Sequence, residues 1–141
     1  MVAAGNTPCW ILGANLASAA MIEGVAAIVV DGCVRDLDEI AEMKMPVFCR
    51  GGGTRPFSTH LELSDVNVPV EFAGAQIRPD DIVVGDADGL VIVPGDRAED
   101  VLFQAGDIGD FEKESREAIE RKAPLSDLGA IIARKHLPRK N

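Results

Sequence analysis

A cation and an anion stand side by side in the stretch VVDGCVRDLDEI, residues 29–40. Arg35 and Asp36 follow strand-forming residues that end in Asp-Gly and come immediately before a helical pattern. In open α/β sheets, ligands bind at this place, beyond the carboxyl ends of the strands. A guanidinium can bind the edge of a carboxylate or keto acid, and a carboxylate can hold Mg²⁺. From the residues alone, a salt bridge or a helix cap explains the pair equally well.

Other candidate sites fit structural roles better. Residues 51–53 are three glycines that could cradle a phosphate, but no GK[ST] follows them, so they indicate a loop. The DADG run at residues 86–89 lacks the remaining ligands of a calcium loop and indicates a hairpin turn. His60 and His136 have no paired ligand spacing. We therefore interpret both as surface or core histidines.

Length and charge restrict the class of protein. The 141 residues, 47% of them apolar, fit one domain over residues 1–141, with a helical C-terminal extension from about residue 96. The 23 acidic residues outnumber the 14 basic ones, which argues against a nucleic-acid partner. Cys9, Cys33 and Cys49 share no disulfide or zinc spacing and indicate reduced thiols in a cytoplasmic protein. The N-terminal pattern indicates neither a signal peptide nor a membrane span, so no membrane partner is expected.

The first half of the chain predicts a parallel α/β layer. Residues 9–12 are compatible with a short strand or with the first turn of a helix, because Thr7 and Pro8 resemble a cap and a first-turn proline. A helix is predicted from Ala14 to a stop at Gly24. Its expected apolar side comprises Leu16, Ala19, Ala20 and Ile22. A strand at 25–30, a helix at 36–43 with Leu37, Ile40 and Ala41 on its apolar face, and a strand at 46–49 follow.

The second half predicts hairpins and then helices. Short β segments are expected at residues 66–72, 75–77, 82–84 and 90–93, separated by glycine, proline and aspartate turns. From residue 96 the pattern is helical in two or three pieces. Residues 111–122 form the clearest piece, and Pro124 begins a new one.

Three longer runs of the sequence favour a functional site, rather than only a salt bridge or a helix cap, at Arg35 and Asp36. They are GANLASAAMIEGVAAIVVDGCVRD, PVFCRG and VNVPVEFAGAQIRPDDIVVGDADGLVIVP, and together they fall within residues 12–94. In this order they closely resemble the RraA-like family. That family includes divalent-metal aldolases for 4-hydroxy-4-methyl-2-oxoglutarate and 4-carboxy-4-hydroxy-2-oxoadipate, and the regulator of ribonuclease E activity. The resemblance implies a swivelling β/β/α fold, in trimers or hexamers with active sites at subunit interfaces.

The resemblance also implies roles for individual residues. Arg35 matches the arginine that binds the pyruvate oxygens, and Asp36 matches the aspartate that helps to hold Mg²⁺ or Mn²⁺. The segment whose backbone amides bind the substrate carboxylate matches Gly13, Ala14, Asn15 and Leu16. Since free amides lie at a helix start, residues 9–12 are then expected to be a strand. The implied reaction is cleavage of a 4-hydroxy-2-oxo acid, or decarboxylation of oxaloacetate, to pyruvate through an enolate.

Two departures from the family pattern keep a second function open. The aldolases have an acidic residue at the position of Ala14, so the metal would have only Asp36. Family members also carry a long segment ahead of the amide loop, whereas twelve residues precede Gly13 here. We expect either a truncated chain or partners that cover an exposed sheet edge.

A further acidic residue, lent by a neighbouring subunit in the aldolases, has no definite match here, although Glu112 and Glu114 lie in a plausible region. The alternative to a lyase is a non-catalytic, protein-binding regulator, such as a ribonuclease E inhibitor.

Overall fold

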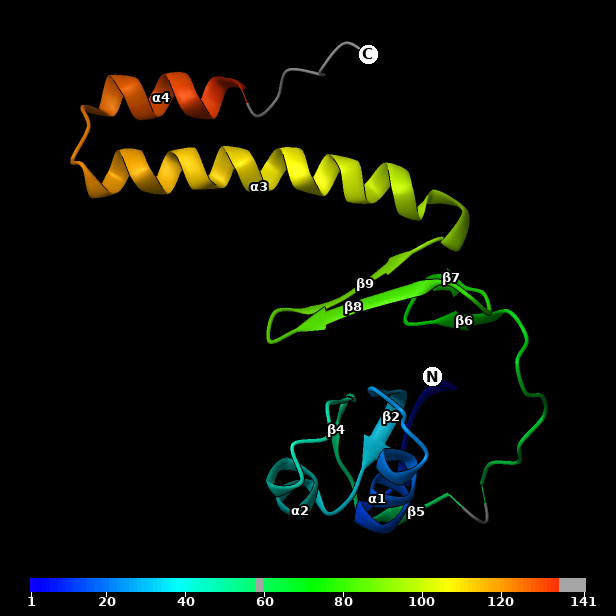
Figure 1. The fold of residues 1–141 in the computed structure, drawn as a ribbon. Helices are drawn as coiled ribbons and strands as arrows, with labels where there is room; N and C mark the ends of the chain where they lie inside the picture. Colours follow the sequence, from blue (N-terminus) through cyan, green and yellow to red (C-terminus); the bar gives the residue numbers. More distant parts are fainter. Residues whose placement is uncertain (58–59, 135–141) are drawn as a thin grey trace. The chain divides into compact units, whose positions relative to one another are not determined.

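The computed structural model describes residues 1–57 and 60–134, and the chain forms two compact units, Met1–Ile92 and Val93–Asn141 (Figure 1). His136 lies outside the described residues. His60 is exposed and accepts a hydrogen bond at its Nε2 from Arg55 Nε at 3.2 Å, as a surface histidine would. The single domain expected from the chain length stays a prediction.

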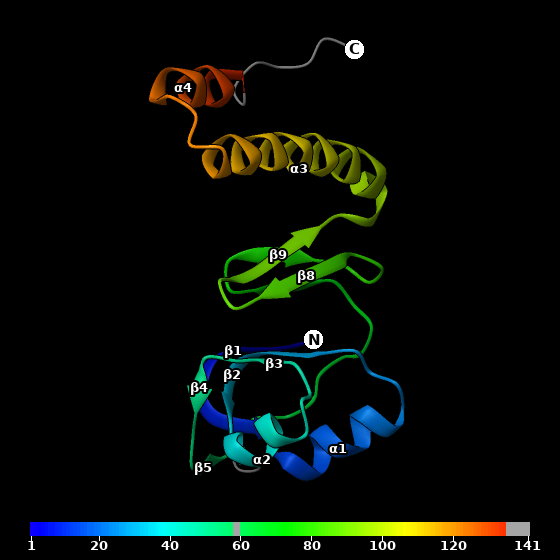
Figure 2. The ribbon, with the colours of Figure 1, turned by 60° about the vertical axis from the view of Figure 1, so that its left-hand side comes forward.

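A parallel sheet forms the body of the first unit. Its strands are β1 (Val2–Leu12), β2 (Ile28–Val34), β3 (Val47–Phe48), β4 (Gly51–Gly52) and β5 (Arg55–Pro56). They lie in the order β3-β2-β1-β5, β4 pairs with β2, and all these pairs are parallel. Helices α1 (Ala14–Ile22) and α2 (Leu37–Glu42) provide the connections between the first strands (Figure 2). The predicted parallel α/β layer is confirmed.

Helix α1 begins and ends where its sequence predicts, but it buries a different face. Residues 9–12 belong to β1, so the helix starts only at Ala14. Gly24 has φ +78°, and its N–H donates to Met21 O at 3.0 Å, which closes the helix with a glycine in the left-handed conformation. The expected apolar side is wrong at three of its four positions: Leu16 and Ile22 are 58% and 83% exposed and Ala19 is exposed, whereas Ala20 packs against the core. The small Ala14 and Ala17 are buried instead.

These two alanines join the main core of the sheet layer. The core cluster comprises Leu12, Ala14, Ala17, Val30, Val34, Ile40 and Met45. Alanine side chains let a helix approach a sheet closely, and the large apolar residues of α1 are left facing outward. Of the face predicted for α2, only Ile40 is buried, whereas Leu37 and Ala41 are exposed.

Strand β2 extends further than the sequence predicts. The strand expected at residues 25–30 instead runs from Ile28 to Val34, so Asp31 and Gly32 lie inside it. Parallel partners on both sides explain the extension, because β1, β3 and β4 together pair with its whole length. Asp31 is buried and forms an ion pair with Arg50.

The three glycines at residues 51–53 are not simply a loop. Gly51 and Gly52 pair with Cys33 and Val34 as strand β4. A side chain on Gly53 would meet Cys33 Cβ at 2.7 Å and the carbonyl oxygen of Pro8 at 3.1 Å. Glycine therefore stands here because the segment packs directly against the neighbouring strands. Cys9, Cys33 and Cys49 are free thiols, of which Cys9 is buried and the other two are partly buried.

Two hairpins complete the first unit. Strand β6 (Val70–Phe72) starts later than its predicted segment and pairs antiparallel with β7 (Ala75–Ile77). Strand β8 (Ile82–Asp86) pairs with β9 (Gly89–Val93). Between them the N–H of Asp88 donates to Asp86 Oδ1 at 2.8 Å, so the predicted hairpin turn is confirmed.

The second unit is helical. A short 3₁₀ turn, η1 (Gly95–Arg97), leads into α3 (Ala98–Glu120), and α4 (Leu125–Arg134) follows. The segment predicted as two or three helical pieces is thus two helices, the first of them continuous over 23 residues. Arg134 and Glu114 join α4 to α3 with an ion pair at 2.6 Å. Among the described residues, no helix is both long enough and apolar enough to cross a membrane.

Candidate active site

The sheet brings the predicted site residues together at the carboxyl ends of β1 and β2. Arg35 and Asp36 fill the two positions between the end of β2 and the start of α2. Gly13 fills the position between β1 and α1. The N–H of Arg35 donates to Leu12 O at 3.0 Å, which fixes the two strand ends beside each other. Residues separated by more than twenty positions therefore share one site.

The carboxylate of Asp36 is the central group of this site. Its Oδ2 accepts a hydrogen bond from the N–H of Ala14 at 3.2 Å and lies 3.4 Å from Arg35 Nε. It makes no side-chain cap of its own helix, although Asp36 occupies the cap position of α2 with φ 60° and ψ 40°. The salt bridge expected as the alternative to a site is therefore present. The same Asp36 carboxylate also accepts the hydrogen bond from Ala14 at the start of the other helix, α1.

The first turn of α1 offers backbone donors next to this pair. The first bond within the helix runs from the N–H of Ala17 to Gly13 O at 3.1 Å, so the three preceding amides have no partner inside the helix. Asp36 takes the amide of Ala14. Among residues 1–57 and 60–134, no hydrogen-bond acceptor is found for the amides of Asn15 and Leu16, which lie at the positive end of the helix dipole. This arrangement suits the carboxylate of a ligand.

Gly13 makes the close approach of these groups possible. A Cβ built on Gly13 would lie 2.5 Å from Asp36 Oδ2 and 2.9 Å from both Cγ and Nε of Arg35. Real Cβ atoms do not approach neighbours so closely. Because φ is −136° and ψ is −171°, the backbone itself would accept any residue. The glycine is needed for space alone.

Two aromatic residues that sequence reasoning missed also lie at this site. The guanidinium carbon of Arg35 lies 4.4 Å from the centroid of the Trp10 ring. The ring of Phe57 meets Trp10 edge to face, with centroids 5.4 Å apart. The signal that could have revealed Trp10 is its place in β1, two residues before the strand ends at the amide loop.

One carboxylate, that of Asp36, is available to a metal ion at this site. Among residues 1–57 and 60–134, no group of three His, Cys, Asp or Glu side chains could hold a metal ion. Asp36 Oδ2 is engaged as described, and in the described chain its Oδ1 has no partner. With a side chain 37% exposed, Asp36 fits a water-rich Mg²⁺, which commonly uses one or two protein carboxylates. Glu112 and Glu114 belong to α3 in the other unit, and their predicted role stays a prediction.

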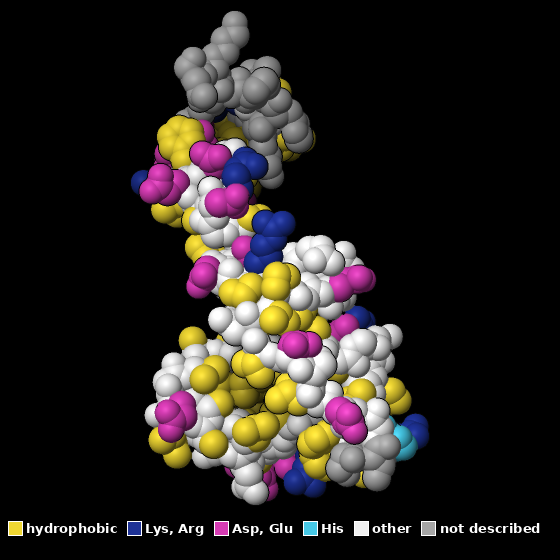
Figure 3. Space-filling model, turned by 90° about the vertical axis from the view of Figure 1, so that its right-hand side faces the viewer, with side chains coloured by type: hydrophobic (Ala, Val, Ile, Leu, Met, Phe, Trp, Pro, Cys, Tyr) yellow, Lys and Arg dark blue, Asp and Glu magenta, His cyan; other side chains and the backbone are white. Residues whose placement is uncertain are grey.

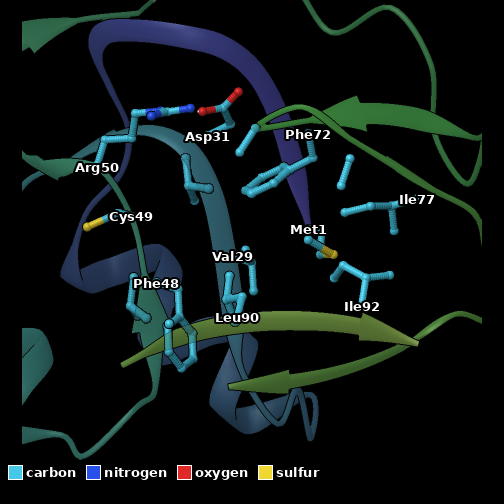
Figure 4. A pocket seen from close by; sticks show the side chains of 15 residues that line it. Met1, Val29, Asp31, Phe48, Cys49, Arg50, Phe72, Ile77, Leu90 and Ile92 are labelled. Atoms are coloured by element: carbon cyan, nitrogen blue, oxygen red, sulfur yellow. The ribbon is translucent and has the colours of Figure 1, made fainter. Parts of the chain in front are cut away.

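A separate cavity of about 530 Å³ lies between the sheet and the two hairpins of the first unit. Apolar side chains of β2, β3, β6, β7 and β9 line it, and the Asp31–Arg50 pair stands at its side (Figure 4). None of the predicted site residues lines it. On the face drawn in Figure 3, apolar side chains gather on this unit with few charges among them. The cavity is therefore distinct from the Arg35 and Asp36 site.

Comparison with known proteins identifies the family of this chain. A family model described as "RraA-like: Aldolase/RraA" matches residues 1–92, and the chain belongs to this RraA-like family. The suspected resemblance is thereby confirmed. The fold agrees as well, because a crystal structure of an uncharacterized protein from Pseudomonas syringae pv. tomato superposes with a TM-score of 0.84 at 29% identity. That match covers 90% of this chain and 64% of the other.

Two curated relatives are also similar, the first of them named an uncharacterized protein. Protein MJ0644 of Methanocaldococcus jannaschii is 37% identical over 113 residues, which cover 77% of this chain and 52% of the relative. A Halalkalibacterium halodurans protein named "Putative 4-hydroxy-4-methyl-2-oxoglutarate aldolase" is 42% identical over 82 residues, which cover 58% of this chain and 39% of the relative. The chain thus spans about half the length of these relatives, or less.

One solved structure represents the regulator side of the family. It is RraAS2 of Streptomyces coelicolor, described as an unusual member of the RNase ES inhibitor RraA protein family. It superposes with a TM-score of 0.71 at 35% identity and covers 77% of this chain and 56% of its own. The family thus includes both aldolase and inhibitor names.

Proposed function

We propose that the chain provides a divalent-metal-dependent lyase site for small 2-oxo acids. The reactions would be aldol cleavage of a 4-hydroxy-4-methyl-2-oxoglutarate type of substrate and decarboxylation of oxaloacetate, both of which release pyruvate. The observation that carries the proposal is the convergence of Arg35, Asp36 and the first amides of α1 at one sheet edge. Each of these groups has a part in binding or polarising a 2-oxo acid.

Arg35 and the amide turn would bind the two ends of the substrate's oxo-acid group. The guanidinium is half exposed and presents in-plane donors to a planar keto-carboxylate edge. The free amides of Asn15 and Leu16 would receive the carboxylate at the helix start. Binding at both places orients the carbon-carbon bond that must break.

Asp36 would hold Mg²⁺ or Mn²⁺ through one carboxylate and water, with the substrate supplying further oxygens. The cation supplies Lewis-acid stabilisation of negative charge on the oxo oxygen. Arg35 and Asp36 are neighbours in the chain and 3.4 Å apart from Nε to Oδ2, so the residue that would bind the substrate lies beside the residue that would bind the metal. Arg35 would add a second positive charge beside the oxo acid.

Decarboxylation of oxaloacetate needs fewer catalytic groups at this site than aldol cleavage does. The bond from C3 to the departing carboxylate breaks, its electron pair forms the enolate of pyruvate, and a proton from water is then added at C3. Arg35 would stabilise the enolate oxygen as its charge develops. Aldol cleavage also needs a base for the 4-hydroxyl proton. For that base the chain offers no assigned residue, so oxaloacetate is the sharper first substrate.

A binding function is the second candidate, and one residue favours it. Ala14 stands where the aldolases carry an acid, so the metal has a single carboxylate here. Similarity to RraAS2 of Streptomyces coelicolor, an unusual member of the RNase ES inhibitor RraA protein family, fits such a role. In that case the chain would act by binding a ribonuclease or another protein, without turnover.

Pyruvate release from oxaloacetate separates the two functions. The assay compares the unsubstituted protein with Arg35→Lys and Asp36→Asn over a titration of Mg²⁺, against the rate with the metal alone. A lyase should exceed the metal-only rate and lose this excess in both variants. Equal rates for all three proteins and for the metal alone would remove the lyase proposal and leave the binding function.

A further inference from the structure

Arg35 has a second neighbour besides Asp36, and it is aromatic. Trp10 lies on β1 with β2 on one side and β5 on the other, paired with Cys33 and Pro56. Its ring centroid is 4.4 Å from the guanidinium carbon of Arg35. This separation is well within the roughly 6 Å reach of a cation–π contact. The Trp10 indole therefore contacts the Arg35 guanidinium.

The ion pair by itself restrains Arg35 only weakly. Arg35 Nε lies 3.4 Å from Asp36 Oδ2, and the two side chains are 49% and 37% exposed. An ion pair that is open to water is screened, and long side chains lose rotamer freedom when they form one. Some other contact must hold the guanidinium if its fork is to meet a substrate in a defined orientation.

The contact with Trp10 can provide that restraint. A guanidinium carries its five N–H groups in one plane, so an indole against its planar face would leave them free to bind an anion. Phe57 meets the indole at an interplanar angle of 85°, and this contact limits tilting of the indole in turn. Phe57 therefore restrains Trp10, and Trp10 restrains Arg35.

We propose that Trp10 is a positioning residue that fixes the orientation of Arg35 for a planar 2-oxo acid, with Phe57 holding Trp10. The inference rests on the proposed function, in which Arg35 binds that acid. Trp10 is given no contact with the reacting atoms. Its effect on the substrate passes through Arg35.

Oxalate is a suitable probe because it is a planar dianion with the shape of the pyruvate enolate. Its affinity for the full chain is measured by calorimetry in the presence of Mg²⁺. Trp10→Leu removes the π face and should weaken oxalate binding about 2- to 30-fold, the range that a cation–π contact supports. Trp10→Phe keeps a smaller π face and should restore most of the affinity. Circular dichroism and the melting temperature check that each variant folds.

A double-substitution cycle tests whether Trp10 acts through Arg35. In the Arg35→Ala background, Trp10→Leu should cause no further loss of oxalate affinity. Equal losses in both backgrounds would assign Trp10 a general structural role and overturn the inference. Oxalate binding that needs Arg35 but is unchanged in Trp10→Leu would overturn it too, while the proposed function stands. Absence of oxalate binding by the unsubstituted protein would remove the proposed function and, with it, the inference.

The composition of the chain gives a readout that does not depend on the folding of the Trp10 variants. The protein contains one tryptophan and no tyrosine, so its indole emission comes from Trp10 alone. Oxalate that binds Arg35 should change this emission in the unsubstituted protein and leave it unchanged in Arg35→Ala. Calorimetric binding with an unaltered emission spectrum would contradict the stacked arrangement.

Discussion

The carboxylate of Asp36 accepts a hydrogen bond at 3.2 Å from the backbone N–H of Ala14, which lies 22 positions earlier in the chain. This bond ties the start of α1 to the start of α2 across the ends of two parallel strands. It also places the predicted metal ligand against the predicted anion-binding turn. A change on either side should therefore affect the other.

Replacement of Arg35 by lysine should separate charge from geometry. A lysine keeps the positive charge but lacks the planar fork of donors. If the lyase proposal holds, pyruvate release should fall about 10- to 100-fold, as expected for a lost charge-assisted contact of roughly 1.5 to 3 kcal/mol. The melting temperature should hardly change, because Arg35 is half exposed. A variant with unaltered turnover would exclude Arg35 from the site.

Gly13→Ala tests the crowding at the centre of the site. The new methyl group would overlap Asp36 Oδ2 and the Arg35 side chain, so both must move. We expect oxalate affinity to fall at least about tenfold, since misplacement by roughly 1 Å can lower activity a hundredfold. Gly106→Ala in α3 is the matched control. Its Cβ meets nothing within 4 Å, and it should leave affinity unchanged and stabilise the helix by about 0.5–1 kcal/mol. Similar affinities for both variants would contradict the crowded geometry.

Ala14→Asp restores the acidic residue of the aldolases at a buried position. Ala14 is 3% exposed, and its N–H already faces the Asp36 carboxylate. Without metal, the second carboxylate should lower the melting temperature, because a buried charge and a like-charge neighbour are both unfavourable. Mg²⁺ should reverse this loss, and its affinity should rise about 10- to 100-fold. The neutral Ala14→Asn is the control and should show no rescue by Mg²⁺. Equal responses of the two variants to Mg²⁺ would place the metal elsewhere.

Self-association is expected from the apolar residues that the described chain leaves exposed. In the first unit they include Ile82, Val83, Val84 and Val91 of β8 and β9, and in the second unit they include Leu102 and Phe103 of α3. Exposed apolar surface on a unit is commonly covered by another protein surface. We expect a trimer or a dimer of trimers in light scattering at micromolar concentration. A stable, well-folded monomer under these conditions would contradict the prediction.

Most of the fold follows from local patterns in the sequence. Short-range signals predict the alternation of α1, β2, α2 and β3, the end of α1 at Gly24 and the turn between β8 and β9. They do not predict the first residues of β1 or the short strands β4 and β5. The errors have a tertiary cause. Strand pairing extended β2 through Asp31, and close packing selected Ala14 and Ala17 as the buried face of α1. Neither choice is visible in the hydrophobic periodicity of a single segment.

The candidate site also has a part that the sequence predicts and a part that it does not. The position of Arg35 and Asp36 after a strand and before a helix is a local signal, and family resemblance added the amide turn. The stack of Trp10 on Arg35 could not be predicted, because it depends on the register between β1 and β2. That register is irregular: five positions separate Val2 and Thr7, whereas only two separate their partners on β2. Counting along the sequence cannot reveal which side chains then become neighbours.

The left-handed backbone at Asp36, with φ 60° and ψ 40°, also limits how this position can change during divergence. Glycine accepts this conformation without strain, and asparagine and aspartate accept it more readily than other residues do. Of these three, only aspartate carries a charge. A lineage that gives up the carboxylate is therefore expected to pass to asparagine or glycine here rather than to alanine. Such a chain would keep the bend that joins β2 to α2 after the chemistry has gone.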